Sequence, residues 1–584
     1  MKTLVFAPHA AIWIHAFPEA LVAESLVKAG HDIVYVTCDR QFHEYCVAMS
    51  ASGLAFGAPE QERRAVCDRC RAHAGLLRER FPFRGSELGD WLKPDDDARI
   101  RESVASASRD DPGASEIASL AVGRFALYQL LIRRKKMTLE FSDDEWAEYL
   151  VHLASSARAA IALERLFAAE RPDRVLLYNG LYSVNLTCRH IAERAGIPTY
   201  FLHAGGNLAH RLQTLMVGRD HTHRFYPALL KHWARFRDRP VPPALARAVT
   251  DHFVELLGGR SGFVYSARKA TASAGIRERF GIAPQARILV ATLGSYDEEF
   301  AAEAVGARVH GRPPMFPMQA DWVRALCGFA ASRPDLFLIV RVHPREYPNR
   351  REQVQSQHAG LLRKALADLP ANVRVNWPDD EISIYALAEE TDVFLNSWSS
   401  VGKEMSLLGL PVVTYAPDLL FYPPELNYSA QSPEQFFAAI DAALADGWSA
   451  ERIRLTYRWL AVEYGYGLVD IADGYAAREN ETPPLAVRAW NRARRIVDPL
   501  HLQKRDCARR PDRLQSAASI TRLVDSAQET VLDILADEGL DEAAAAEEDR
   551  AIRSQMARLL PHLYPGETSG RPGTLQARLR EFAR

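Results

Sequence analysis

The sequence has no excess of charge of either sign and no long apolar run. Lysine and arginine together number 72 and aspartate and glutamate 74 among 584 residues, so no overall field attracts nucleic acid and any anion site must be local. No apolar segment approaches the roughly eighteen residues that a membrane-spanning helix needs. The segment Met1–His9 is typical of a short strand rather than a signal peptide. We therefore expect a cytoplasmic protein without nucleic-acid partners, whose contact with the inner face of a membrane is peripheral.

A basic patch ends one amphipathic segment. Residues 125–132 have the spacing of an amphipathic helix, and four basic residues, Arg133–Lys136, follow them. Cations are favoured at the carboxyl terminus of a helix, where the backbone dipole is negative. The same patch has the charge to bind an anionic lipid or polymer. Both interpretations are open from the sequence.

The seven cysteines are an odd number, which argues against a disulfide framework in a chain that starts without a signal peptide. Four of them cluster early, as Cys38, Cys46, Cys67 and Cys70. Thiolates at the C-x-x-C spacing of the last two suit tetrahedral zinc, and the first two complete four ligands if the intervening loop folds back. We therefore predict one structural zinc. The alternative is that the four are small buried apolar residues, because the first pair lacks this spacing.

The first 260 residues show an α/β rhythm. An apolar run at 3–7, a helical pattern at 17–29 and a second run at 31–37 open a Rossmann-like sheet. The G-x-G-x-x-G fingerprint is missing from this opening, which disfavours a nicotinamide or flavin cofactor. Residues from about 81 to 170 are largely helical in pattern. The sequence predicts an N-terminal Rossmann-like domain over residues 1–260, with a helical insertion at 81–170.

A second α/β series occupies residues 261–450. Apolar runs at 287–292, 336–342 and 392–396 each lead into a polar loop, which predicts a second doubly wound sheet. Residues 451–584 are helical in pattern, with Gly, Pro and Thr concentrated at 565–575. The predicted fold class is α/β. It has two Rossmann-like doubly wound domains facing a cleft, the GT-B arrangement, with a helical insertion and a C-terminal helical appendage that has a loose end.

The loop after the run at 392–396 has the most specific pattern. Ser399, Ser400 and Gly402 precede a helical period that begins with Lys403 and Glu404. A strand, a turn and a helix at the carboxyl edge of a parallel sheet offer free backbone N–H groups and a positive dipole end to a phosphate. The pattern predicts a site for a phosphorylated ligand. The alternative is an ordinary turn, whose serines cap the helix and whose Glu404 complements the dipole.

Two further loops end strands of the same predicted sheet. One contains Gly294 and Ser295, and the other contains His343, Pro344 and Arg345. Hydroxyls, backbone N–H groups and the cations of His343 and Arg345 can stabilise the charge that develops on a leaving phosphate oxygen. No divalent metal is then required, and we find no Asp-x-Asp after a strand. Each loop also has a plain alternative as a turn, which Pro344 would fix by itself.

Several short motifs together resemble a known family. They are Tyr178-Asn179-Gly180, Gly196-Ile-Pro198, His343-Pro344-Arg345 and Ser399-Ser400-Val-Gly402-Lys-Glu404 with Gly409-Leu-Pro411. In this order they resemble the capsule polysaccharide biosynthesis group of GT-B glycosyltransferases, which includes the 3-deoxy-manno-octulosonate transferases. The resemblance covers residues from about 1 to 450 as an order of elements. Such proteins often have an acidic residue before the glycine of the segment after Gly-Ile-Pro, where this chain has His203-Ala-Gly205.

The resemblance implies a glycosyltransferase of surface-polysaccharide assembly. Its donor would be a CMP- or UDP-linked sugar, whose ribose hydroxyls would donate to Glu404, and its acceptor a growing glycan or glycolipid. The acceptor loses a proton as it attacks, so we expect a base on the opposite wall, where His9, His15 and Glu19 are candidates. Two other functions stay open. One is a nucleotide-sugar epimerase of the same architecture, with acid and base on both faces of one sugar; the other is a non-catalytic glycan-binding or scaffold protein.

Overall fold

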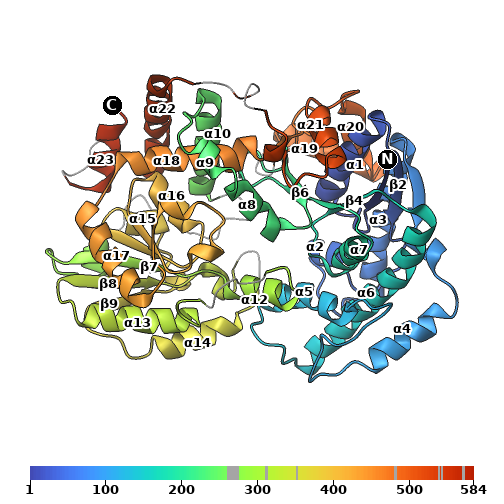
Figure 1. Ribbon diagram of the computed structural model, residues 1–584, viewed down its shortest axis with the longest axis horizontal. Coiled ribbons are helices and arrows are strands. Elements are labelled where there is room, and N and C mark those ends of the chain that lie inside the picture. Colours follow the sequence, from blue (N-terminus) through green and yellow to red (C-terminus); the bar gives the residue numbers. More distant parts are fainter. Residues whose placement is uncertain are drawn as a thin grey trace.

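The computed structural model describes residues 1–259, 275–308, 314–349, 353–478, 483–536, 540, 543–567 and 573–584. These residues form two halves, each built on a β-sheet with helices on both faces (Figure 1). The predicted α/β fold class with two Rossmann-like domains is therefore confirmed. The predicted boundary at residue 260 lies outside the described residues, as do residues 568–572 of the predicted loose end.

The N-terminal sheet has the strand order β13-β6-β5-β4-β1-β2-β3. Its strands are β1 (Lys2–Phe6), β2 (Asp32–Thr37), β3 (Arg84–Glu87), β4 (Arg174–Tyr178), β5 (Thr199–Ala204), β6 (Thr214–Arg219) and β13 (Val469–Asp470). The strands from β3 to β5 pair in parallel, whereas β6 runs antiparallel to both β5 and β13. The order reverses between β1 and β4, and in such sheets ligands bind outside the strand ends at this switch point.

The C-terminal sheet is parallel throughout, in the order β12-β11-β10-β7-β8-β9. Its strands are β7 (Arg287–Thr292), β8 (Leu336–Arg341), β9 (Val373–Asn376), β10 (Val393–Asn396), β11 (Val412–Thr414) and β12 (Tyr428–Ser429). Read from β9, this is the doubly wound order of a dinucleotide-binding sheet. The order reverses between β7 and β10, so the second switch point lies between the loops that follow these strands.

Helices cover both faces of the N-terminal sheet. The helices of this half are α1 (Trp13–Lys28), α2 (Val47–Ala51), α3 (Glu60–Arg80), α4 (Asp96–Ala105), α5 (Val122–Arg134), α6 (Asp143–Glu170), α7 (Ser183–Arg194), α8 (Thr222–Leu230), α9 (Trp233–Phe236) and α10 (Pro243–Gly258). One apolar core joins the sheet to α5, α6 and α7, and a second joins its other face to α1 and α3. Because successive strand residues point to opposite faces, continuous apolar runs supply both cores.

The C-terminal sheet is covered in the same way. Its helices are α11 (Ile276–Phe280), α12 (Tyr296–Ala304), α13 (Gln319–Ala331), α14 (Gln357–Ala365), α15 (Ile384–Ala388), α16 (Val401–Leu407) and α17 (Pro433–Asp446). The helices α13, α14 and α17 pack on one face, and α15 and α16 on the other. The switch-point loops are thus held between rigid, fully covered strands.

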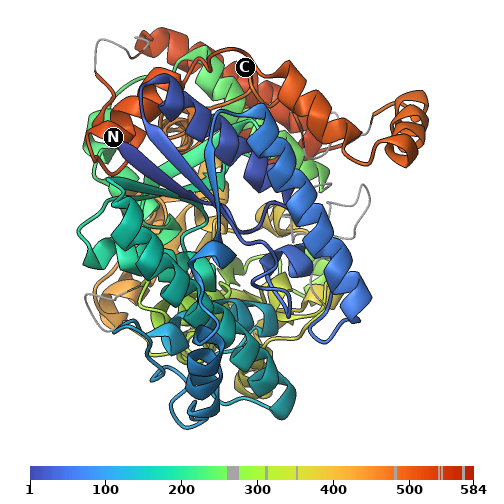
Figure 2. The same ribbon diagram turned by 90° about the vertical axis from the view of Figure 1, so that its right-hand side faces the viewer.

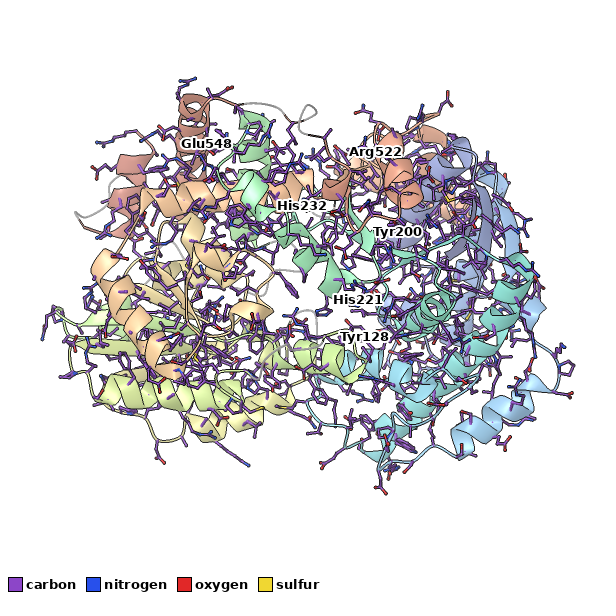
Figure 3. The ribbon with its side chains drawn as sticks, viewed as in Figure 1. Tyr128, Tyr200, His221, His232, Arg522 and Glu548 are labelled. Carbon is purple, nitrogen blue, oxygen red and sulfur yellow. The ribbon has the colours of Figure 1, made fainter. Side chains whose placement is uncertain are left out.

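The residues after 450 are mainly helical, as predicted, but they pack on both halves rather than standing apart. Their helices are α18 (Ala450–Ala461), a π-helix (Val462–Tyr466), α19 (Leu485–Val497), α20 (His501–Arg509), α21 (Ala517–Asp525), α22 (Ala545–Leu563) and α23 (Leu575–Phe582). The Tyr200 hydroxyl of β5 lies 2.9 Å from the Leu523 carbonyl of α21. Glu548 of α22 accepts from Arg458 of α18 at 2.7 Å and from the Val241 backbone N–H at 2.9 Å. Tyr200 and Glu548 mark these two contacts of the tail in Figure 3.

Four strands, β3, β6, β12 and β13, have no counterpart in the sequence prediction. The segment Arg84–Glu87, within the predicted helical insertion, forms the edge strand β3 although it contains no apolar residue. The strand β6 follows a loop that the sequence leaves irregular, and β13 is supplied by the tail. Each lies at or near an edge of the sheet, where burial does not require a continuous apolar run.

Candidate functional site

The sequence-predicted residues lie at the two switch points. In the N-terminal half, His9 follows β1, while His15 and Glu19 lie on α1 directly after it. In the C-terminal half, Gly294 and Ser295 follow β7, and Ser399 and Ser400 follow β10. His343 follows β8, the neighbour of β7. The fold therefore brings most of these residues to the carboxyl edges of the sheets, where parallel α/β proteins bind ligands.

Close packing holds the loop after β10. A side chain at Gly402 would place its Cβ only 1.8 Å from the Tyr422 hydroxyl and 2.6 Å from Asn396 Nδ2. Tyr422 in turn accepts a hydrogen bond from Asn396 at 3.0 Å and donates one to Asn427 at 2.8 Å. Gly402 is therefore required by the approach of Tyr422. This gives it a structural role whether or not a phosphate binds nearby.

Glu404 connects the start of α16 to α15. Its Oε1 accepts from the Ser400 hydroxyl at 2.7 Å, and its Oε2 accepts from the Tyr385 hydroxyl at 2.9 Å. Ser400 is exposed. The hydroxyl of Ser399, the residue before it, accepts from the Val401 backbone N–H at 3.3 Å. The loop thus presents two hydroxyls at the sheet edge, and the buried carboxylate of Glu404 orients one of them.

His343 is a neutral hydrogen-bonding group rather than a cation. Its Nδ1 accepts from the Arg345 backbone N–H at 3.2 Å and lies 3.4 Å from the Ser295 hydroxyl. Burial lowers the pKa of His343 to about 4. An imidazole that accepts at Nδ1 carries its proton on Nε2. The histidine predicted to act as a phosphate cation is therefore a neutral donor at neutral pH.

Arg345 contacts residues of both halves. Its guanidinium is buried and pairs with Asp297 of α12, and its Nη2 lies 3.4 Å from the Ile132 carbonyl of α5. The Lys135 ammonium, also buried, donates to the Arg345 carbonyl at 2.5 Å. Tyr128 of α5 lies in the same junction of the two halves, beside α12 (Figure 3). Arg345 joins the two halves in this arrangement.

The basic residues of the predicted membrane patch, Arg133–Lys136, also contact internal partners. Arg133 and Arg134 pair with buried Glu148 at 2.7 and 3.1 Å. Lys135 and Lys136 are themselves buried. Charges committed to internal partners cannot attract a lipid surface, so the alternative, cations at a helix carboxyl terminus, is the one that the structure supports.

Gly294 is a point of close approach between the loops after β7 and β10. A Cβ there would lie 2.6 Å from Trp398 Nε1 and 3.0 Å from Ser397 Oγ. The Gln319 side chain accepts from the Gly294 N–H at 3.1 Å and donates to its carbonyl at 3.2 Å. Its backbone groups are thus occupied, so Gly294 shapes the site rather than binding a ligand through its N–H.

An aromatic cavity of about 350 Å³ lies beside these loops. Its aromatic lining residues are Tyr296, Phe300, Phe316, Trp398 and Tyr415. Trp398 directly precedes the two serines, so the cavity and the hydroxyls share one loop. Ligand pockets are commonly of this size and lined by aromatic side chains with a few polar groups. The sequence feature that belongs to this cavity is Trp398, inside the serine loop. It could not be interpreted from the sequence, because only the fold brings Tyr415 and Phe316 beside it.

The loop after β5 reaches toward the tail and the C-terminal half. Gly206 lies against Tyr464 and Glu463 of the π-helix, since a Cβ there would be 3.3 Å from Tyr464 Cε1. Glu463 also accepts from Lys403 of α16 at 2.5 Å. Single π-turns are rare and are frequent at functional sites. The sequence did not indicate this junction, because its three parts are far apart along the chain.

The three predicted base candidates lie in a largely buried region at the N-terminal switch point. The His15 ring stacks on Tyr178 of β4, with centroids 3.9 Å apart and ring planes 12° from parallel. Burial lowers the pKa of His9 to about 4, and burial followed by the nearby His203 lowers that of His15. Burial also raises the pKa of Glu19 well above its ordinary value. At neutral pH the two imidazoles are thus neutral, and burial favours the uncharged form of the Glu19 carboxyl.

His9, His15 and Glu19 line one small cavity of about 10 Å³, together with Tyr182 and Asn185. Glu19 Oε1 and Asn185 Oδ1 are buried polar atoms without a hydrogen-bond partner among the described residues. Buried polar atoms are normally paired, and a volume of this size is about what one hydroxyl-sized group needs. The three predicted base candidates therefore converge, and they do so around a polar cavity.

Arg211 is a charged neighbour that the sequence analysis missed. It lowers the pKa values of His15 and His203 electrostatically, and its Nη1 donates to the Gly205 carbonyl at 3.1 Å. It follows β5, in the loop where the resembling family often has an acidic residue. A cation in this loop would favour an anionic group near the N-terminal switch point.

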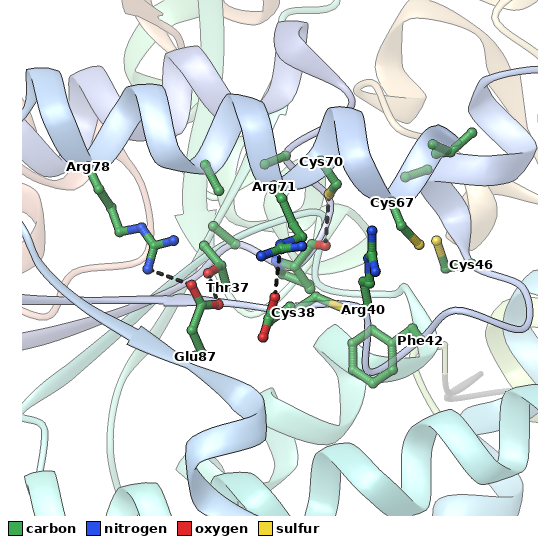
Figure 4. Close-up of a pocket in the computed structure, with 17 residues that line it drawn as sticks. Thr37, Cys38, Arg40, Phe42, Cys46, Cys67, Cys70, Arg71, Arg78 and Glu87 are labelled. Atoms are coloured by element: carbon green, nitrogen blue, oxygen red, sulfur yellow. Dashed lines mark hydrogen bonds and ion pairs between the residues drawn. The ribbon is translucent and has the colours of Figure 1, made fainter. Parts of the chain in front are cut away.

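The four early cysteines line one pocket, as the predicted folding back of their loop requires (Figure 4). Burial raises the pKa of each thiol, to about 12 for Cys46 and about 11 for Cys70. Zinc binds thiolates. Among the described residues, no group of three or more Cys, His, Asp or Glu is placed so that it could hold a metal ion. Cys67 is buried and the other three are half-buried, and Cys70 Sγ accepts from the Ala11 backbone N–H at 3.3 Å.

Two Rossmann-like doubly wound sheets, one in each half, are the arrangement of the GT-B architecture. No protein-family model matches the chain, and neither does any curated protein. None of the described helices is both long and apolar enough to cross a bilayer.

Several solved structures are similar to the chain at low identity. A putative UDP-N-acetylglucosamine 2-epimerase from Listeria monocytogenes is 12% identical, covering 80% of this chain and 92% of its own, with a TM-score of 0.25. CalG4, the calicheamicin glycosyltransferase, is 14% identical, covering 79% and 94%, with a TM-score of 0.24. The beta Kdo 2,4 transferase KpsC from Thermosulfurimonas dismutans is 17% identical, covering 46% and 79%, with a TM-score of 0.27. These similarities do not indicate a reaction or a ligand, and the assignment of the architecture rests on strand order.

Proposed function

We propose that the protein is a glycosyltransferase that moves a sugar from a CMP- or UDP-linked donor to a growing surface polysaccharide or glycolipid. Residues 261–450 would bind the nucleotide sugar and residues 1–260 the acceptor. The observation that carries the proposal is the different chemistry of the two switch points. Hydroxyls and a neutral imidazole beside an aromatic cavity lie on one side, and buried neutral imidazoles lie on the other.

On the donor side, the base of the nucleotide would enter the aromatic cavity next to Trp398. Stacking on aromatic rings suits any base and fixes its place. The phosphate would then lie at the hydroxyls of Ser399 and Ser400 and at His343, which donates from Nε2. These groups stabilise the charge on the phosphate oxygen as its bond to the sugar breaks. The proposal needs no divalent metal for this step.

On the acceptor side, a neutral imidazole can take a proton. An acceptor hydroxyl would attack the anomeric carbon and transfer its proton to His15 or His9, while the nucleotide leaves with the electrons of the broken bond. Glu19, protonated by burial, would serve as a hydrogen-bond donor in place of the predicted base. The charge that Arg211 brings to this edge would favour an anionic glycan as the acceptor.

Nucleotide binding is the first test. CMP, UDP and GDP are added singly, and the melting temperature is followed, because a ligand that binds only the native state raises it. We expect CMP or UDP to raise it in the presence of EDTA. Transfer is then assayed with the matching nucleotide sugars. Interconversion of the sugar without an acceptor would favour an epimerase, and neither binding nor turnover would favour a non-catalytic protein.

Single-residue variants test the donor side and the acceptor side of the proposed site separately. Ser400→Ala and His343→Ala should weaken nucleotide binding and transfer by roughly ten- to a hundredfold each, the effect of losing a hydrogen bond to a charged group. Ser106→Ala removes an exposed hydroxyl at the end of α4 and is the control. His15→Ala should lower turnover with little change in nucleotide affinity. Full affinity and full transfer in both donor-side variants would overturn the assignment.

A further inference from the structure

Exposed large apolar side chains are concentrated in one helix. Over the described residues, those with the largest exposure are Met1, Ile14, Leu361, Leu485, Val487, Trp490, Ile496 and Val497. The last five belong to α19, where Leu485, Ile496 and Val497 are 78, 81 and 85% exposed. No residue of this helix is buried. In Figure 2 the helix, drawn in orange, projects from the upper right of the molecule. Such a concentration on a projecting element marks an interaction surface.

The apolar side chains of α19, apart from Val487, form a single face. At 100° per residue, seven positions fall within about 140° of arc. These positions are Leu485, Ala486, Ala489, Trp490, Ala493, Ile496 and Val497. The remaining positions carry four arginines, Arg488, Arg492, Arg494 and Arg495, and no acidic residue. The sequence analysis did not single out this segment, because it lies in a region assigned only by its general helical pattern.

The charge of α19 contrasts with that of the whole chain. The chain has a formal net charge of −2, whereas the four arginines of α19 have no acidic partner within the helix. Arg494 lies over the Trp490 ring, 4.6 Å from its centroid, at the border between the two faces. A helix with an apolar face, an arginine-rich opposite face and a tryptophan at the border has the pattern of helices that lie in a membrane interface.

We propose that α19 docks the protein on an anionic phospholipid bilayer, lying in the plane of the interface with its apolar face in the acyl boundary. A second copy of the chain would bring two arginine-rich helices together, and like charges at close range oppose that pairing. An anionic headgroup surface instead complements every arginine. Docking through one such helix is reversible and weakens as salt screens the attraction.

The docked helix is tied to the acceptor side of the molecule. After α19 the chain continues into α20, where Asp506 accepts from the Trp13 indole N–H of α1 at 2.9 Å. α1 also carries His15 and Glu19. A membrane bound by α19 would therefore lie on the side of the N-terminal switch point and could present a lipid-linked acceptor there. This last step rests on the proposed function, whereas membrane docking does not.

Vesicle flotation tests the docking without reference to catalysis. The full chain is mixed with phosphatidylcholine vesicles with or without phosphatidylglycerol, at low and high salt. We expect flotation with the anionic vesicles at low salt. Leu485→Glu combined with Ile496→Glu should reduce binding by tenfold or more, because two apolar contacts become charges. Leu361→Glu, at an exposed leucine of α14, is the matched control and should float as the wild type does.

Charge variants measure the electrostatic contribution to vesicle binding separately from the apolar contribution. Arg492→Gln combined with Arg495→Gln should lower binding about fivefold for each arginine removed and should flatten the salt dependence. Arg492 and Arg495 are exposed, so the melting temperature of this double variant should not change. The arginine variant therefore still tests the proposal if the glutamate variants fold poorly.

Three outcomes would overturn the proposal. One is flotation that is unchanged in all α19 variants. Another is equal binding to neutral and anionic vesicles. The third is a wild-type dimer in sedimentation that the glutamate pair dissociates, without vesicle binding, which would make this face a subunit contact. None of these outcomes depends on transfer activity, so the proposed function could fail while docking holds.

Discussion

The two switch points have the same topology but opposite electrostatics. At the N-terminal one, burial keeps His9 and His15 neutral and Glu19 protonated. At the C-terminal one, charged side chains persist because each has a partner, as Arg345 has in Asp297 and Lys403 in Glu463. A buried charge is tolerated when it is paired, and otherwise the group becomes neutral. The first edge therefore holds uncharged polar groups in a buried environment, and the second holds paired charges in a rigid polar frame.

The largest expected effect is on the paired charges. Arg345→Ala leaves Asp297 buried without its partner, and breaking such a pair costs about 3–5 kcal/mol. Urea unfolding should show this loss. Arg324→Ala, which removes an exposed pair with Asp321, should cost less than about 1 kcal/mol. Wild-type stability of the Arg345 variant together with lost nucleotide affinity would instead return this residue to the phosphate site predicted from sequence.

The glycines of the two switch points respond differently to a methyl group. A Cβ at Gly180 would lie 2.1 Å from the Asp220 carbonyl oxygen, whereas one at Gly402 would meet the Tyr422 hydroxyl. Overpacking of this kind costs about 1–3 kcal/mol. Thermal unfolding should show a loss for both Gly180→Ala and Gly402→Ala. Only the second should be partly relieved by Tyr422→Phe, because this change removes the hydroxyl but leaves Asn396 Nδ2 at 2.6 Å, whereas the Asp220 backbone cannot be shortened.

Gly360→Ala is the control for these glycine variants, because no atom lies within 4 Å of a Cβ built at Gly360 in α14. In a helix this change should be neutral or stabilise by up to about 1 kcal/mol. An equal loss in all three alanine variants would mean that close packing does not explain the losses at Gly180 and Gly402.

The sequence predicted the sheets well because their central strands are buried on both faces and read as continuous apolar runs. It missed β3 and β13, which lie at the edges, and β13 pairs Val469 with Leu215 far away along the chain. It placed His9, His15, Glu19 and the serine loop at the strand ends, since loop position follows from strand order. It could not give their charges or partners. Whether Arg345 contacts Asp297 or a phosphate is decided by how α12 packs against α5, and no local pattern records that.

The smallest expected effect concerns acid. The pKa of His9 falls from 6.5 to about 4 on folding, so between these values the unfolded chain binds the proton more tightly. Stability is then complete above pH 6.5 and decreases as the pH falls toward 4. At pH 5.5 the loss from one such histidine is about 1 kcal/mol relative to pH 7. His9→Gln should remove it, so the difference in unfolding free energy between pH 7 and 5.5 should shrink by this amount. An unchanged pH dependence in the His9 variant would mean that this imidazole is hydrated or paired in the native state. Only His15 and Glu19 would then distinguish the N-terminal switch point from the C-terminal one by groups that burial keeps uncharged.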